Sequence, residues 1–307
     1  MDSTIDSVEF ATVSDSQRAQ ALAMLASHEP ACERTGRIAT IVTAFRDADV
    51  SAATLVGATR DANLLAVAWG QILPGKTALL WPPRLATNES QAVGDRLQAF
   101  LDSQLEATGI CMAQAVLSDC KHSDAARLER VGYTHAADLL YLVSQLLQFE
   151  ATAAEVGIDF VQYTQADRKR LSDLVERTYI DTLDVPALNG VRDTDDVLSG
   201  YEQTGEFSPH RWFFIRNNDE DVGCLLLNDH PGQQQWELVY MGIVPESRGN
   251  GWGRQATRFA QRLAKDAGRE RLILAVDATN DPAVGAYTRA GFFELLRRSV
   301  YLKIFTA

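Results

Sequence analysis

The chain has 307 residues, 46% hydrophobic and 23% charged, and this composition excludes a disordered, collagen-like or coiled-coil protein. Its 29 basic and 41 acidic side chains give a net charge of −12, so the surface repels phosphate backbones and we expect no nucleic-acid partner. At about 150 residues per domain, the length favours two domains.

The chain carries no sign of export or of membrane insertion. Residues 1–7 are polar and acidic, and the apolar runs are far shorter than the roughly 20 residues of a membrane helix. The cysteines have neither metal-like nor redox-like spacing, and the histidines are scattered. We therefore expect a cytoplasmic protein without a metal site, with four free thiols at Cys32, Cys111, Cys120 and Cys224.

The sequence contains a hidden duplication, found by laying residues 84–142 on residues 243–301. The offset of 159 is fixed by pairing two glycines, Gly132 with Gly291, and two further glycine pairs then fall into place. In each half, one of these glycines follows a long amphipathic pattern, as expected of a left-handed helix C-cap. The independent pairs are Gly94 with Gly253 and Gly109 with Gly268.

Taken in chain order, the two halves predict the same elements. The first half predicts a helix at 16–26, hairpin strands at 54–59 and 64–71, a helix at 89–108, strands at 111–117 and 139–143, and between these two strands a short helix ending at Gly132. The second half predicts a helix at 166–179, hairpin strands at 212–216 and 223–227, a helix at 251–267, strands at 271–277 and 299–305, and between these two a short helix ending at Gly291.

This order predicts the α/β class, with a central mixed sheet flanked by helices in each of two tandem domains. We place the domains at residues 1–150 and 151–307, joined by an Ala/Glu-rich linker at 148–157. The alternative is one large domain whose halves match by accident.

The sharpest local signal is an apolar strand that runs into a glycine-rich turn and then a helix, over residues 236–253. A helix N-terminus carries unpaired N–H groups and partial positive charge, so such a turn can hold an anion. The turn lacks the Walker pattern, and Arg254 stands where the dinucleotide fingerprint requires its third glycine.

Two patterns in this half resemble signatures of the GNAT acetyltransferase superfamily, and the resemblance extends over residues 158–307. The first is R-x-x-G-x-G at Arg248, Gly251 and Gly253, and the second is N-x-P-A-x-x-x-Y-x-x-x-G-F from Asn280 to Phe292. The resemblance implies acetyl-CoA as cosubstrate. It places the cofactor-binding residues at Met241, Gly242, Ile243, Val244, Arg248, Gly249, Asn250, Gly251, Trp252, Gly253, Arg254, Asn280 and Tyr287.

The resemblance also implies two catalytic residues. Tyr287 matches the tyrosine that protonates the departing thiolate, a role suited to a phenol whose ordinary pKa is near 10. Glu237 matches a glutamate base that takes a proton from the acceptor amine. The alternatives are a core aromatic for Tyr287 and a solvated charge at the start of a strand for Glu237.

The first copy lacks these residues at the corresponding positions. Pro82 and Pro83 interrupt its strand, and two prolines remove two backbone donors. We therefore expect the N-terminal copy to have lost acetyl-CoA binding. At the offset of 159, the positions of Arg248, Gly251, Asn280, Tyr287 and Glu237 correspond in the first copy to Glu89, Ala92, Lys121, Leu128 and Ala78.

These observations predict an N-acetyltransferase that transfers the acetyl group directly to a small amine in a ternary complex. Residues 181–206 hold seven acids against Arg192 alone, which favours a cationic acceptor. Tandem chains with one working half occur in the family, so the chain can be a monomer or a homodimer. The alternative function is a non-enzymatic acyl-CoA-binding or regulatory module.

Overall fold

The computed structural model describes residues 7–26, 54–118, 123–150 and 157–305. The described chain forms two compact units. Unit 1 contains Met1–His135 and Val300–Ala307, and unit 2 contains Ala136–Ser299. Each compact unit therefore combines residues from both halves of the sequence.

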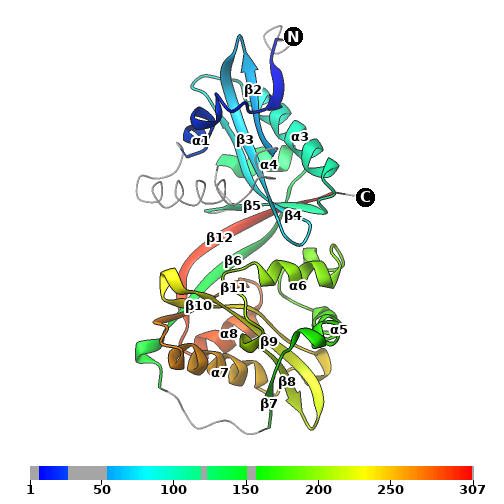
Figure 1. Ribbon diagram of the computed structural model, residues 1–307, viewed down its shortest axis with the longest axis vertical. Coiled ribbons are helices and arrows are strands. Elements are labelled where there is room, and N and C mark those ends of the chain that lie inside the picture. Colours follow the sequence, from blue (N-terminus) through cyan, green and yellow to red (C-terminus); the bar gives the residue numbers. More distant parts are fainter. Residues whose placement is uncertain (1–6, 27–53, 119–122, 151–156, 306–307) are drawn as a thin grey trace. The chain divides into compact units, whose positions relative to one another are not determined.

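Unit 1 is a mixed sheet with strand order β1-β2-β3-β4-β5-β12, in which β4 and β5 are parallel (Figure 1). Its strands are β1 (Glu9–Thr12), β2 (Leu55–Arg60), β3 (Asn63–Leu73), β4 (Thr77–Leu85), β5 (Met112–Leu117) and the end of β12 (Phe293–Ile304). The helices among its described residues are α1 (Arg18–Ala26), α3 (Gln91–Ala107) and α4 (Ser123–Arg130).

Unit 2 repeats this plan with strand order β12-β6-β11-β10-β9-β8-β7, in which β10 and β11 are parallel. Its strands are β6 (Thr134–Gln145), β7 (Asp159–Gln162), β8 (Trp212–Asn217), β9 (Glu220–His230), β10 (Gln235–Ile243), β11 (Arg271–Asp277) and the start of β12. Its α-helices are α5 (Arg168–Tyr179), α6 (Thr194–Glu202), α7 (Trp252–Asp266) and α8 (Asp281–Arg289). Six 3-10 turns lie at Leu146–Gln148, Gln165–Asp167, Pro186–Leu188, Pro209–Arg211, Pro231–Gln233 and Pro245–Ser247.

The last strand of the first sequence half belongs mainly to unit 2, and the last strand of the second half is divided between the two units. β6 follows the elements of unit 1, yet its residues from Ala136 onward lie in unit 2, paired antiparallel with β11. β12 ends the chain, and its residues from Val300 onward lie in unit 1, where Phe305 N donates to Cys111 O at 2.9 Å. This exchange was not predicted, because either apolar strand suits either sheet edge.

The predicted mixed α/β class is confirmed, and the repeat is visible in the backbone. Gly109 and Gly268 end α3 and α7 at φ of +77° and +75°, and Gly132 and Gly291 follow α4 and α8 at +91° and +89°. β11 has the predicted bounds, whereas β6 and β12 begin five and six residues earlier than predicted. The predicted linker lies largely outside the described residues, as do Lys121, Cys32 and Cys120.

Register assigns the side chains of unit 2 to the two faces of its sheet. Leu272, Leu274 and Val276 alternate toward the side covered by α7, where Gln261 Nε2 donates to Ser144 Oγ at 2.7 Å. α7 buries Ala256, Ala260 and Ala264 at four-residue spacing, and these small side chains let it lie close to the strands. Glu237 and its partner Ile273 therefore face the other side of the sheet.

A buried polar network holds the end of β12 in unit 1. The Asp102 carboxylate, on α3, accepts hydrogen bonds from Gln98 Nε2, Tyr133 Oη and Lys303 Nζ, each at 2.8 Å. Burial is the larger cause that raises the pKa of Tyr133, and the Asp102 carboxylate raises it further. Because Lys303 lies on β12, this network links the last strand of the chain to the helix of the first half.

We expect Asp102→Ala to lower the free energy of unfolding by about 3 kcal/mol, because it leaves a lysine and two neutral donors without their shared acceptor. The matched control is Asp15→Ala, which removes the exposed partner of Arg18 in the same unit and costs below about 1 kcal/mol. Urea unfolding of both variants measures the difference. Equal losses would show that the network adds nothing beyond an ordinary surface pair.

Candidate active site

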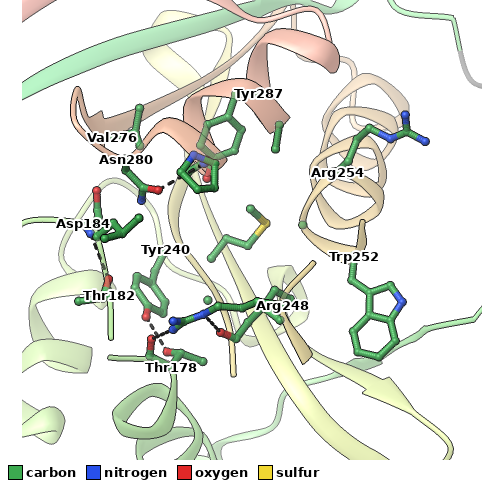
Figure 2. Close-up of a pocket in the computed structure, with 18 of the residues that line it drawn as sticks. Thr178, Thr182, Asp184, Tyr240, Arg248, Trp252, Arg254, Val276, Asn280 and Tyr287 are labelled. Carbon is green, nitrogen blue, oxygen red and sulfur yellow. Dashed lines mark hydrogen bonds between the residues drawn. The ribbon is translucent and has the colours of Figure 1, made fainter. Parts of the chain in front are cut away.

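Unit 2 contains a cavity of about 530 Å³. Its walls come from β10, the end of β11, the first turn of α7, α8 and the loop after α5 (Figure 2). Figure 2 shows Tyr287 and Asn280 at one end of this cavity and Thr178 and Arg248 at the other. The cavity therefore joins both sequence signatures of the second half.

The cavity lies where two parallel strands separate. β10 and β11 pair only from Gln235 to Leu238, although β10 continues to Ile243 and β11 to Asp277. At the same point the register of β10 against β9 shifts between Leu238 and Tyr240, as at a β-bulge. A bulge bends its strand, so β10 turns away from β11 and opens a gap between the two backbones. An extended ligand can lie in this gap and hydrogen-bond to the strand.

The glycine-rich turn meets one end of this gap. Gly249 and Gly251 have φ of +84° and +78°, a backbone conformation that glycine adopts at little cost. Gly251 is the N-cap of α7, and no side chain caps this helix. The N–H groups of the first turn of α7, together with the positive end of its dipole, are therefore available to an anion.

The Arg248 side chain acts as a clamp on the backbone. Its guanidinium donates to four carbonyls, those of Ile243, Thr178, Ile180 and Asp181, at 3.1, 2.9, 2.8 and 3.0 Å. It thereby ties the glycine turn to the loop after α5. Electrostatic contact between this side chain and an anion stays a prediction, whereas the carbonyl contacts assign it a positioning role.

The structure brings most of the predicted site residues to the cavity. Val244 is buried outside the lining, and Asn250 is bonded to Ser247 O. Asn280 lines the cavity while its Oδ1 accepts from Ala283 N at 3.3 Å, capping α8. The lining includes Met241, Gly242, Ile243, Arg248, Gly249, Gly251, Trp252, Gly253, Arg254, Asn280 and Tyr287.

Tyr287 is buried in the wall of the cavity. It lies on α8, packed against Phe292 with a ring-centroid distance of 5.8 Å, and is 5% exposed. Burial, and then the negative charge of Asp184, raise its pKa well above the ordinary value. A raised pKa keeps the phenol protonated at neutral pH, so Tyr287 can hold and donate a proton.

Glu237 lies beside the cavity and not in its lining. It precedes by one residue the point where β10 and β11 separate, and its side chain is 23% exposed. Its Oε2 is 2.8 Å from His230 Nε2, and this hydrogen bond raises the pKa of His230. The pair places a carboxylate and a titratable imidazole at the base of the gap, on the sheet face away from α7.

Sequence reasoning missed several residues of the site. Asp184 lines the cavity, and its Oδ1 accepts from Asp277 N at 2.9 Å. Burial is the main cause that raises the pKa of Asp184. On the other wall, Tyr240 Oη is 2.6 Å from Thr178 Oγ1. A Cβ on Gly242 would lie 2.6 Å from the same Thr178 oxygen, so Gly242 was the available signal for this close approach.

Several acidic side chains of residues 181–206 bind other groups of the fold. Asp195 and Glu202 bind Arg168, and Asp193 caps α6. Of the seven acids, Asp181 and Asp184 line the cavity. On α7, Arg254 lines the cavity, whereas Arg258 bonds to Glu150 O and Arg262 lies over the Phe259 ring.

Unit 1 holds an ion network at the positions that line the cavity in unit 2. The offset of 159 relates Ile243, Ala283 and Ala286 to Arg84, Asp124 and Arg127. Arg84 Nη1 is 2.6 Å from Asp124 Oδ2, and Arg127 Nη1 donates to Pro83 O at 2.6 Å. Two alanines of the cavity are thus replaced by a buried aspartate and a buried arginine.

The anion position of unit 1 is also closed. Ser90 Oγ accepts from Ala92 N at 3.3 Å and caps α3, the counterpart of the uncapped α7. Glu89 is 3.5 Å from Arg60. These contacts support the prediction that the first copy does not bind the cofactor.

Within the described ranges, no group of three or more potential ligands could hold a metal ion, and no helix is long and apolar enough to cross a membrane. Two of the predicted free thiols are described, Cys111 half-buried and Cys224 buried. Burial raises the pKa of Cys224 to about 12, which keeps it a thiol at neutral pH.

Solved structures similar to this chain define its class as an acetyltransferase fold. A GCN5-related N-acetyltransferase from Sphaerobacter thermophilus aligns over 97% of this chain and 96% of its own, with a TM-score of 0.63 and 16% identity. A tandem GNAT protein from the clavulanic acid biosynthesis pathway aligns over 97% and 98%, with a TM-score of 0.53 and 13% identity. At these identities the likeness concerns the fold alone.

Sequence comparison then gives the family of the second half. Residues 177–292 match the Acetyltransferase (GNAT) family and form a domain of that family. Mycothiol acetyltransferases of Streptomyces bingchenggensis and Corynebacterium efficiens are 35% and 37% identical over 86 and 90 residues. These matches span 28% and 29% of this chain and 28% and 30% of the relatives, so less than a third of their length. A mycothiol acetyltransferase of Saccharomonospora viridis is 28% identical over 193 residues, covering 56% of this chain and 58% of its own.

We expect Glu237→Gln to lower the free energy of unfolding at pH 6 and to leave it unchanged at pH 9. Because the pKa of His230 is raised in the folded chain, the pair stabilises the fold below the ordinary histidine pKa, and this contribution disappears as the pH rises through the raised value. For a partly exposed pair, the effect is about 1 kcal/mol or less.

Urea unfolding at the two pH values measures the effect. The control is Glu246→Gln, whose partner Arg177 stays charged throughout, so its effect is the same at pH 6 and pH 9. A loss for Glu237→Gln that does not depend on pH would exclude an ionic His230 partner.

Proposed function

We propose that this chain is an acetyl-CoA-dependent N-acetyltransferase that acts on a small amine by direct transfer in a ternary complex. One observation carries the proposal. A single cavity combines a strand gap, an uncapped helix N-terminus and a buried tyrosine that keeps its proton. The GNAT domain at residues 177–292 supports the same activity.

The residues at the cavity fit the cosubstrate. The turn from Gly249 to Gly253 presents backbone N–H groups to the diphosphate, with Arg254 beside it. The separated part of β10, from Val239 to Ile243, presents backbone donors and acceptors to the extended pantetheine arm. When bound, acetyl-CoA supplies the acetyl thioester.

The acceptor amine must lose a proton before it can attack, because a primary ammonium has no free electron pair. Glu237 lies next to the base of the gap and takes this proton, and His230 accepts it from Glu237 in turn. The nitrogen then bonds to the acetyl carbon as the carbon–sulfur bond breaks. Tyr287 donates its proton to the sulfur, and the phenolate regains a proton that the new amide nitrogen loses.

The test is a pair of measurements on the full chain. Acetyl-CoA should raise the melting temperature, because a ligand that binds only the folded state stabilises it. Free thiol should then appear when amines are added, in a screen of aminoglycosides, polyamines, amino acids and peptide N-termini. A thermal shift without thiol release for any amine would favour the non-enzymatic acyl-CoA-binding module. No shift would exclude both functions.

We expect Tyr287→Phe to lower kcat by about 100-fold, in the range typical of general acid catalysis, with little change in the Kd of acetyl-CoA. Phenylalanine keeps the ring and its packing against Phe292 and removes only the proton donor. Thiol release measures kcat, and calorimetry measures Kd. An unchanged kcat would remove Tyr287 from the mechanism.

A further inference from the structure

The face of the unit 2 sheet away from α7 is open next to the cavity. Glu237 on β10 lies opposite Ile273 on β11, and two residues further along β11 Ala275 lies opposite Tyr141 on β6. Side chains two residues apart on a strand share a face, so these four residues lie on one side of the sheet. Ala275 is exposed and also lines the cavity, so this open face is continuous with the cavity.

Tyr141 lies between charges of opposite sign on this face. Burial is the main cause that raises the pKa of Tyr141. The carboxylate of Glu237 raises this pKa further, and the guanidinium of Arg298 lowers it. Both charges therefore act on one phenol. Tyr141 belongs to β6, the strand that the N-terminal half of the sequence contributes to unit 2.

Arg298 faces the same side from β12. Its neighbour Ser299 donates through Oγ to Asp138 Oδ1 at 2.6 Å, and Asp138, two residues before Leu140, shares the face of β6 that is turned toward α7. Arg298 must therefore point to the opposite, open face. It is partly exposed, and among the described residues its guanidinium has neither a carboxylate partner nor a hydrogen-bond acceptor.

We propose that Arg298, with the phenol of Tyr141 beside it, binds a carboxylate of the acceptor, while the amine of the same molecule lies at Glu237. This inference rests on the proposed transferase function and names its acceptor class, an amine that also carries a carboxylate. A guanidinium binds a carboxylate through two parallel hydrogen bonds. One guanidinium and one neutral phenol match a single negative charge, and Glu237 nearby disfavours a doubly charged phosphate.

The strand spacing sets the length of this acceptor. Three strand steps separate β10 from β12, about 14 Å at roughly 4.8 Å per step, and Arg298 lies about four residues, roughly 13 Å, further along the strands than Glu237. The two side chains cover part of this distance. The amine and the carboxylate are therefore several bonds apart, as in an ω-amino acid or a short peptide, and not on one carbon atom.

The experiment compares 4-aminobutyrate, 6-aminohexanoate and glycylglycine with their carboxamides, using thiol release for kcat/KM and calorimetry in the presence of CoA for binding. We expect a preference for at least one acid over its amide of about 10- to 100-fold, the range of a charge-assisted bidentate contact. R298Q should remove this preference, because glutamine carries no charge to pair with the carboxylate.

The matched control is R297Q, on the other face of the same strand, where Arg297 is 3.7 Å from Glu294. It should keep the preference. Equal kcat/KM for every acid and its amide in the unmutated chain would overturn the carboxylate site and leave the transferase function standing. A stronger preference for O-phosphoethanolamine would also overturn it. If R298Q abolishes the binding of an acid, the carboxylate site is supported even where no thiol is released. The absence of thiol release then counts only against the proposed transferase function.

Discussion

The separation of β10 from β11 is the constraint on which the site depends. Two parallel strands that paired along their whole length would satisfy each other's backbone groups and leave no room for a ligand. The register shift after Leu238 ends the pairing, and the following residues of β10 keep hydrogen-bonding capacity that β11 does not use. The gap lies between the uncapped N-terminus of α7 and the buried phenol of Tyr287.

The same fold in unit 1 differs from unit 2 at the positions that line the cavity. The pairing of β4 with β5 also ends early, after Leu79, so the gap itself is inherited. Its surroundings have changed in charge and volume, because Asp124 and Arg127 stand where unit 2 has alanines, and Ser90 caps the helix. A helix whose N-terminal N–H is already bonded offers less to an anion. Among the described residues, the positions that line the cavity of unit 2 therefore correspond in unit 1 to charged side chains that pair with one another.

β6 places a strand of the first sequence half in unit 2. β6 brings Tyr141 to the open face of unit 2, beside the end of the cavity at Ala275. In return, β12 brings Lys303 to the buried carboxylate of Asp102 in unit 1.

The sequence by itself determined the repeat, the mixed α/β class and the cavity-lining turn at Gly249–Gly253. Local rules suffice for these features, since helix ends require left-handed glycines and a backbone-bound anion requires small residues. Tertiary structure alone decided that Arg248 clamps four carbonyls, that His230 meets Glu237, that Asp184 and Tyr287 line one cavity and that β6 joins unit 2. Each of these depends on contacts between residues distant in sequence, and hydrophobic periodicity carries no information about which edge an apolar strand will join.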